Sequence, residues 1–338
     1  MALPAGGWRG PPGSGAARGP VVLARRRAHK AVMRRKTGTP LPHNVFFRRI
    51  VRAMALAAGA GARPSACGPL AGFLKLLPPA RAGGQQTADI SFSSAEPGAV
   101  RFSVNDCGRR GVSGTRIGAW AAKLGAGYDL KALAGFLKLG GYLGADFQTT
   151  AALAWAAGRE FPILKLYLED SPGMAGAFRD AGFRQHVRSL AGLAALEMTG
   201  QAPEILAMDF SPDGATELKA YVRLDCLPAA GTCGAGRAAM RLLNMEHRCF
   251  YYEMLRFSSG GRKIYKVYEP GCAVNPAAGI LEICGLFNRL GIAQGAGFAA
   301  VYGAMARRGG FRLVPSLCGV GLSACGKLKV DAYFRFAR

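Results

Sequence analysis

The segment ELKAYVRL (Glu217–Leu224) alternates polar and apolar residues with a period of two. In an extended strand this pattern puts Glu217, Lys219, Tyr221 and Arg223 on one face and the apolar residues on the other. Taken alone, the segment is typical of a surface strand whose charges are solvated. Its Lys-x-Tyr centre returns elsewhere in the chain, and that recurrence decides the fold that we predict.

Lys-x-Tyr strands are the repeated feature of this sequence. They comprise Lys165–Tyr167, Lys219–Tyr221, Lys266–Tyr268 and, near the end of the chain, a looser group of Lys327, Lys329 and Tyr333 on one strand face. Arg101 in AVRFSVN occupies the corresponding place near the start. Each of these strands follows a second strand-like segment, which indicates a hairpin. A Pro-Asp-Gly turn, for example, joins EILAMDFS to ELKAYVRL.

Segments of helical character separate the hairpins. They lie at 117–140, 173–198, 237–245 and 276–308. Five hairpins with helices between them predict an α+β fold, a ten-stranded antiparallel β-barrel surrounded by α-helices. The apolar strand face would then contact the helices, and the Lys and Tyr face would point inward. Because ten strands leave an interior too wide for side chains to fill, we expect a lumen that holds solvent or a ligand.

A ring of inward cations indicates the chemistry of that ligand. Several cations concentrated within a wall of low dielectric favour a multiply charged anion such as phosphate or diphosphate. A tyrosine lies two residues after Lys165, Lys219 and Lys266, and Tyr333 follows the last lysines on the same strand face. Each tyrosine could donate a hydrogen bond to a phosphate oxygen, and its ring face could stabilise a carbocation. A diphosphate leaving group beside an aromatic cage is the arrangement needed to ionise an allylic prenyl diphosphate.

These strands resemble those of the ABBA-type aromatic prenyltransferases, and within that group the dimethylallyltryptophan synthase-like indole prenyltransferases. The sharpest match is ADISFSSAEPGAVRFSVND, where Asp89 and Arg101 stand in the places of a carboxylate that opens the first strand and an arginine in the next. The hairpin LAMDFSPDGATELKAYV is similar to the family pattern D-…-G-…-[RK]-I-K-x-Y. The resemblance covers residues 88–338.

The resemblance implies transfer of a prenyl group from its diphosphate to an aromatic acceptor, an indole or tryptophan derivative. Asp89 would accept the indole N–H. The diphosphate would be bound by Arg101, Lys165, Lys219, Lys266, Lys327 and Lys329. The allylic cation would be shielded by Tyr167, Tyr221, Tyr268 and Tyr333. Side chains handle the diphosphate in this family, so we expect no metal cofactor. The implied partners are the two small-molecule substrates, bound by a monomer or a homodimer.

Two departures from the family pattern keep an alternative open. Glu217 stands where the family often has another cation, and it would oppose diphosphate unless it pairs with Arg223 or Lys219. Asp89 has a shorter reach than the family's glutamate. A barrel of the same fold that has lost catalysis is therefore an alternative interpretation. Trp120 and Trp155 either line an acceptor pocket or pack in the core.

The charge of the chain is concentrated at its start. The formal net charge is +24, yet no acidic residue precedes Asp89, which leaves 29 basic against 20 acidic residues from that point onward. Residues 1–45, rich in Gly, Pro, Ala and Arg, are predicted to form a disordered extension, with Met33 and Met54 as candidate starts. We expect one domain over residues 46–338. The basic charge also supports a second alternative, a nucleic-acid-binding protein, which would need its Lys-x-Tyr faces on an outer surface.

Cysteine and histidine usage gives no indication of a metal site. The nine cysteines are scattered without a C-x-x-C pair, and the four histidines form no H-E-x-x-H motif. Free thiols in a reducing cytoplasm are the simplest interpretation. No apolar run reaches the roughly 18 to 20 residues that span a bilayer. We therefore expect a cytoplasmic protein.

Overall fold

The structure, a computed structural model, divides the chain into two compact units, Met1–Leu41 and Pro42–Arg338. All described residues belong to the second unit. They are 69, 72–73, 87–93, 100–105, 114–143, 148–155, 160–169, 171–192, 202–224, 249–257, 262–268, 285, 288, 312–323 and 328–337. The predicted disordered extension at 1–45 and the helical segments expected at 237–245 and 276–308 lie outside this set, apart from the isolated positions 285 and 288.

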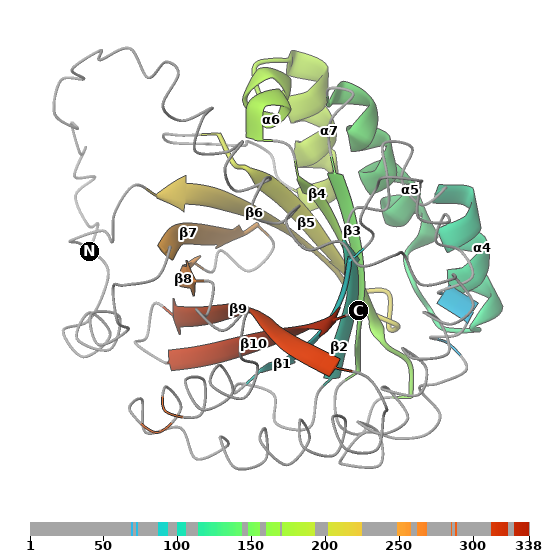
Figure 1. Cartoon of the computed structure of the whole chain (residues 1–338). Helices are drawn as coiled ribbons and strands as arrows, with labels where there is room; N and C mark the ends of the chain where they lie inside the picture. Colours follow the sequence, from blue (N-terminus) through green and yellow to red (C-terminus); the bar gives the residue numbers. More distant parts are fainter. Residues whose placement is uncertain are drawn as a thin grey trace, which may run out of the picture. The chain divides into compact units, whose positions relative to one another are not determined.

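The strands curl into one closed antiparallel sheet (Figure 1). They are β1 (Thr87–Ser93), β2 (Val100–Asn105), β3 (Gln148–Trp155), β4 (Ile163–Glu169), β5 (Ile205–Phe210), β6 (Thr216–Leu224), β7 (Cys249–Arg256), β8 (Arg262–Tyr268), β9 (Arg312–Ser323) and β10 (Leu328–Ala337). Around the barrel the order is β1-β10-β9-β8-β7-β6-β5-β4-β3-β2. Every strand thus pairs with its neighbours in sequence, and the first strand closes the sheet against the last.

Two groups of helices follow two of the hairpins. Between β2 and β3 lie α4 (Gly114–Lys123), α5 (Leu130–Lys138) and the 3₁₀ helix η2 (Leu139–Tyr142). Between β4 and β5 lie α6 (Ser171–Ala177) and α7 (Ala181–Ala191). Figure 1 shows these helices along the outside of the sheet, beside β3 to β6. The repetition of this plan in the other gaps remains a prediction. Over the described segments, no helix is both long and apolar enough to cross a membrane.

Local sequence signals explain where these elements begin and turn. Asp129 and Asp180 precede α5 and α7, and their carboxylates accept backbone N–H groups from Ala132 and Phe183 at 2.9 and 2.8 Å. Both aspartates are N-caps, which satisfy backbone donors that the first helical turn leaves unpaired. In the β5–β6 hairpin, Gly214 has φ +89°, a conformation that favours glycine. The predicted Pro-Asp-Gly turn is confirmed.

The two faces of the strands differ as the alternation predicted. On β4, Leu164, Leu166 and Leu168 are buried, whereas Lys165 and Tyr167 between them keep some exposure. The apolar face of β5 contacts the helices, since the rings of Phe210 and Phe136 on α5 lie 6.3 Å apart. The core therefore lies between sheet and helices. The opposite face, which carries Lys165, Tyr167, Lys219 and Tyr221, faces the space enclosed by the barrel, and we call it the interior face.

The two tryptophans considered for an acceptor pocket belong to the apolar layer. Trp120 lies on α4, and its ring is 5.2 Å from the ring of Phe73. Trp155 ends β3 and pairs with Val100. The neighbouring pair, Ala154 and Arg101, is on the interior face, so the alternation puts Trp155 on the other side of the sheet. Both side chains are buried. Core packing is the interpretation that holds.

Candidate active site

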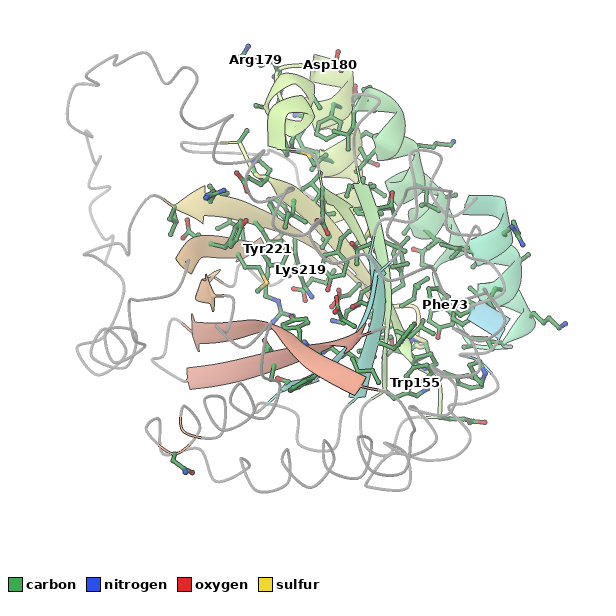
Figure 2. The ribbon with its side chains drawn as sticks, viewed as in Figure 1. Phe73, Trp155, Arg179, Asp180, Lys219 and Tyr221 are labelled. Atoms are coloured by element: carbon green, nitrogen blue, oxygen red, sulfur yellow. The ribbon has the colours of Figure 1, made fainter. Side chains whose placement is uncertain are left out.

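Strand register brings together polar residues that are distant in sequence. Lys165 pairs with Asp209 between β4 and β5, and Ala207 pairs with Lys219 between β5 and β6. Directly paired residues of antiparallel strands share one face of the sheet. Figure 2 shows Lys219 and Tyr221 on the side of β6 that faces the enclosed space. The Lys-x-Tyr faces of β4 and β6 thus converge inward, and they do not spread over an outer surface.

A shared carboxylate joins the two lysines. The Nζ atom of Lys165 donates to Oδ2 of Asp209 at 2.7 Å, and the Nζ atom of Lys219 donates to the same oxygen. The three side chains retain only 12, 10 and 16% exposure for Lys165, Lys219 and Asp209. Two cations held about one anion in so sheltered a place are unusual, because burying charge is costly unless partners compensate. The arrangement fixes both ammonium groups at one point of the interior face.

Burial and neighbouring charges shift the pKa values of this group. Burial lowers the pKa of Lys165 to about 8; Asp209 counteracts this shift, whereas Lys219 and Arg101 add to it. Burial raises the pKa of Asp209, but the two lysines outweigh burial and leave that pKa below its usual value. At neutral pH Lys165 is therefore a cation beside the carboxylate of Asp209. The effect of Arg101 on Lys165 also shows that the β2 arginine lies within electrostatic range of the lysines.

Arg101 has a carboxylate partner of its own. It lies on β2, and its Nη1 atom is 3.5 Å from Oδ1 of Asp331 on β10. The side chain of Asp331 is 4% exposed and that of Arg101 is 16% exposed. This ion pair bridges two strands that flank β1. Three of the cations expected to bind diphosphate, from β2, β4 and β6, consequently face one interior.

Tyr167 lies close to the same charges. Burial raises its pKa well above the usual value, with further contributions from Asp209 and from Tyr333 on β10. Tyr167 on β4 and Tyr333 on β10 are distant in sequence, yet they lie close enough to interact electrostatically. At any physiological pH the Tyr167 phenol is protonated and can donate a hydrogen bond. Tyr221 shares the interior face two residues after Lys219 on β6.

Glu217 is paired with a cation of the neighbouring strand. Its two carboxylate oxygens accept hydrogen bonds from Nε and Nη2 of Arg256 on β7, the first at 2.8 Å. The β6–β7 register pairs Arg256 with Lys219, one interior-face position from Glu217. The condition that Glu217 be paired with a cation is met by Arg256, a residue outside the set that the sequence predicts. Lys219 is held by Asp209, and Arg223 lies 3.7 Å from Glu204 near the other end of β6.

Asp89, the expected acceptor of an indole N–H, lies in β1. It pairs with Ser103 on one side and with Arg335 on the other, and its side chain is buried. Ser91, on the same face of β1, pairs with Arg101 and Tyr333. Asp89 accordingly occupies the interior face beside two strands that carry predicted site residues.

The register of β8 bears on one predicted pair. Tyr252 on β7 pairs with Arg223, an interior-face residue of β6, and with Tyr265 on β8. The alternation therefore assigns Lys263 and Tyr265 to the interior face. Lys266 and Tyr268 occupy the alternate backbone positions of β8, and their side chains lie outside the described set, so the predicted pair stays a prediction. The segment RKIYKVY contains two overlapping Lys-x-Tyr patterns, and only strand pairing distinguishes them.

Lys329, one of the last two predicted cations, belongs to β10. Lys329 pairs with Gly321, and Asp331, two residues on, pairs with Gly319. Lys329 thus shares the face of Asp331 and Tyr333. Lys327 lies outside the described residues.

Three interior residues lie outside the set that the sequence predicts. Asp209, Asp331 and Arg256 each pair with a residue that the prediction did name. Asp331 lies on the same strand face as Lys329 and Tyr333, so the period of two in the sequence already indicated that it points inward. Asp209 and Arg256 needed the pairing register. Within the described segments, no group of three or more His, Cys, Asp or Glu is positioned to hold a metal ion.

Comparison with known proteins bears on this barrel through structure alone. No protein-family model and no curated protein matches the sequence. The 5-dimethylallyltryptophan synthase from Streptomyces coelicolor matches with a TM-score of 0.54 and 16% identity, over 85% of this chain and 96% of that one. PriB, solved with L-tryptophan and dimethylallyl thiolodiphosphate, matches with a TM-score of 0.57 and 14% identity, over 85% and 95%.

The chain has the ABBA prenyltransferase fold. AnaPT from Neosartorya fischeri agrees, with a TM-score of 0.52 and 12% identity over 84% of this chain and 90% of that one. Sharing the ABBA fold at such identities does not assign an activity, because one fold can host several functions.

Proposed function

We propose that the protein transfers an allylic prenyl group from its diphosphate to an electron-rich aromatic acceptor. The observation that carries this proposal is the convergence of Arg101, Lys165 and Lys219 with Tyr167 and Tyr333 inside one barrel. Cations alone would suit many anions. Cations interleaved with tyrosines also suit the carbocation that forms when a diphosphate leaves an allylic carbon.

The first step breaks the bond between the allylic carbon and the diphosphate oxygen. The electron pair leaves with the diphosphate, whose growing charge is stabilised by Arg101, Lys165 and Lys219, with Lys329 and one lysine of β8 completing the ring. The candidate on β8 is Lys266 from the sequence pattern and Lys263 from the register; Lys327 adds a further cation in the last repeat. Side chains already fixed around the departing charge act without reorganisation.

The second step joins the acceptor to the cation. A ring carbon of the acceptor attacks the allylic carbon, and the ring then passes its proton to the released diphosphate and regains its aromaticity. Tyr167, Tyr221, Tyr333 and a tyrosine of β8, Tyr265 or Tyr268, would shield the cation from water and stabilise it through their ring faces. Asp89 would accept the acceptor's N–H, which raises electron density in the ring as it attacks. No step requires a metal ion.

The proposed acceptor is an indole or a tryptophan derivative. One support is the buried carboxylate of Asp89 on the interior face. The other is the similarity of the fold to protein structures solved in complex with L-tryptophan or brevianamide F. PriB was solved with L-tryptophan and dimethylallyl thiolodiphosphate, and NotF with brevianamide F and the same thiolodiphosphate analogue. An ionised carboxylate can accept the N–H of an indole.

The proposal is tested by incubating the purified chain with dimethylallyl or geranyl diphosphate and a panel of indoles. We expect a product whose mass has increased by one prenyl group. Thermal unfolding with and without inorganic diphosphate provides a separate measurement of the anion site. Absence of any product, combined with no diphosphate-induced shift of the unfolding temperature, would contradict the proposed function.

A second candidate is a barrel of this fold without catalysis. It is favoured by the carboxylate partners of the interior cations: Asp209 for both lysines, Asp331 for Arg101 and Glu217 for Arg256. These carboxylates reduce the positive field that diphosphate would meet. A diphosphate-induced thermal shift without any prenylated product would support this candidate over the enzyme.

A further inference from the structure

Among the residues that the structure describes, Asp209 is held in place by the two lysines alone. Oδ2 accepts from both Nζ atoms, whereas Oδ1 is buried and accepts no hydrogen bond from the described part of the protein. The helix-capping carboxylates Asp129 and Asp180 differ, because each is supported by a backbone N–H. A buried carboxylate normally receives several donors. The charge of Asp209 thus depends on the same two ammonium groups that the proposed diphosphate would use.

Diphosphate and Asp209 would compete for these donors. An ammonium group has three N–H donors and can serve more than one acceptor, so binding need not expel the carboxylate. It must, however, place a multiply charged anion next to a carboxylate in a sheltered site where like charges repel strongly. Oδ1 of Asp209 receives no hydrogen bond from the described residues. Among them, Asp209 therefore has no second donor that could replace the two lysines.

We propose that Asp209 is a built-in competitor of diphosphate, which holds Lys165 and Lys219 together and limits how tightly the leaving group binds. This inference rests on the proposed function and assigns a regulatory residue to its anion site. Asp209 keeps the lysines positioned for the substrate and repels the inorganic diphosphate that remains after transfer. Asp209 thus favours release of inorganic diphosphate and lowers the affinity of the site for it.

The decisive measurement is the dissociation constant of inorganic diphosphate for the full chain and for Asp209→Asn. Calorimetry at about pH 6.5 keeps Lys165 protonated in the parent protein, because the pKa of its ammonium group is about 8. Loss of one nearby like charge should tighten diphosphate binding by at least about tenfold. A residue that only positioned the lysines would show the opposite sign, since disordered lysines bind an anion less well.

The matched control is Asp213→Asn. Asp213 belongs to the same hairpin and is exposed, and its carboxylate accepts a turn N–H from Ala215 at 3.1 Å. This variant removes the same formal charge from the chain but none from the lysine pair. Its diphosphate affinity should stay within about twofold of the parent value, because charges in water are strongly screened.

A second pair of variants covers the case in which Asp209→Asn does not fold. Lys165→Gln is compared with the double variant Lys165→Gln/Asp209→Asn, in which one cation and one anion are removed together. The double variant should bind diphosphate more tightly than Lys165→Gln alone. Equal or weaker binding after loss of Asp209, in either background, overturns the inference and leaves the proposed function standing. No binding of diphosphate by parent or variant overturns the anion site and the inference with it.

Discussion

Arg256 on β7 donates two hydrogen bonds to the carboxylate of Glu217 on β6. A guanidinium fork on a carboxylate is the strongest common geometry for an ion pair. The pair neutralises the residue that fits an anion site least well. It also brings a further cation next to Lys219, with which Arg256 is in register.

Breaking this pair from one side should cost more than removing it whole. Arg256→Gln removes the guanidinium that donates to Glu217, and we expect a loss of about 1 to 3 kcal/mol in the free energy of unfolding. The double variant Arg256→Gln/Glu217→Gln should recover a large part of that loss. Chemical denaturation of the three proteins measures the coupling. A double variant less stable than Arg256→Gln would contradict this account of the pair.

Diphosphate binding should weaken as pH rises through about 8, where burial has placed the pKa of Lys165. Protonated Lys165 attracts the anion and neutral Lys165 does not, so affinity is retained below this pH and lost above it. Calorimetric titration from about pH 6 to 10 gives the profile, and Lys165→Gln serves as reference because ionisation of diphosphate affects both proteins alike. Identical profiles for the two proteins would be incompatible with the prediction.

Stability should follow the opposite trend for this group. The Lys165 pKa is about 8 in the folded chain against 10.5 for an ordinary lysine, so the unfolded state binds more protons between these values. The contribution of Lys165 to the free energy of unfolding therefore rises with pH across this interval. Unfolding curves of the parent and Lys165→Gln at about pH 7 and pH 9.5 test the sign. A difference between the proteins that stays constant would rule it out.

Tyr167 is expected to act through its ring. Tyr167→Phe keeps the aromatic face and should retain most of the transfer activity, while Tyr167→Ala should let water reach the allylic cation. The ratio of free prenyl alcohol to prenylated acceptor measures this directly. We expect that ratio to rise at least about tenfold for alanine and to change little for phenylalanine. Equal ratios for both variants would show that the Tyr167 ring does not shield the allylic cation.

The register of β8 predicts which of two overlapping patterns serves the site. Lys263→Ala and Tyr265→Ala should reduce prenyl transfer more than Lys266→Ala and Tyr268→Ala. Comparison of kcat/KM for the four variants decides, with circular dichroism to verify folding. The reverse order would restore the interpretation drawn from the sequence pattern.

Asp89 is predicted to act on the acceptor and not on the diphosphate. Asp89→Asn should lower kcat by about 10² to 10⁴, the usual range for losing a positioned proton acceptor. The dissociation constant of inorganic diphosphate should remain unchanged. A large loss of diphosphate affinity would instead point to a structural role in β1.

Much of the barrel could be predicted because its signals are local. The alternation in ILKLYLE predicts the interior and buried faces of β4, and the Pro-Asp-Gly turn predicts the β5–β6 hairpin. A strand shows which residues share a face from its period of two alone. Because the Lys-x-Tyr pattern recurs in several hairpins, the sequence predicted that the polar strand faces point into the barrel and not toward its outer surface.

The sequence by itself therefore determined the strands, the hairpins and the separation of polar from apolar faces, because these follow from neighbours along the chain. Only the tertiary structure decided the partners. Lys165 and Asp209 lie 44 residues apart, and strand register alone brings them to hydrogen-bond distance. The same register pairs Glu217 with Arg256 and not with a cation on its own strand. Charge partners in a barrel are set by pairing across strands, and a one-residue slip exchanges the two faces.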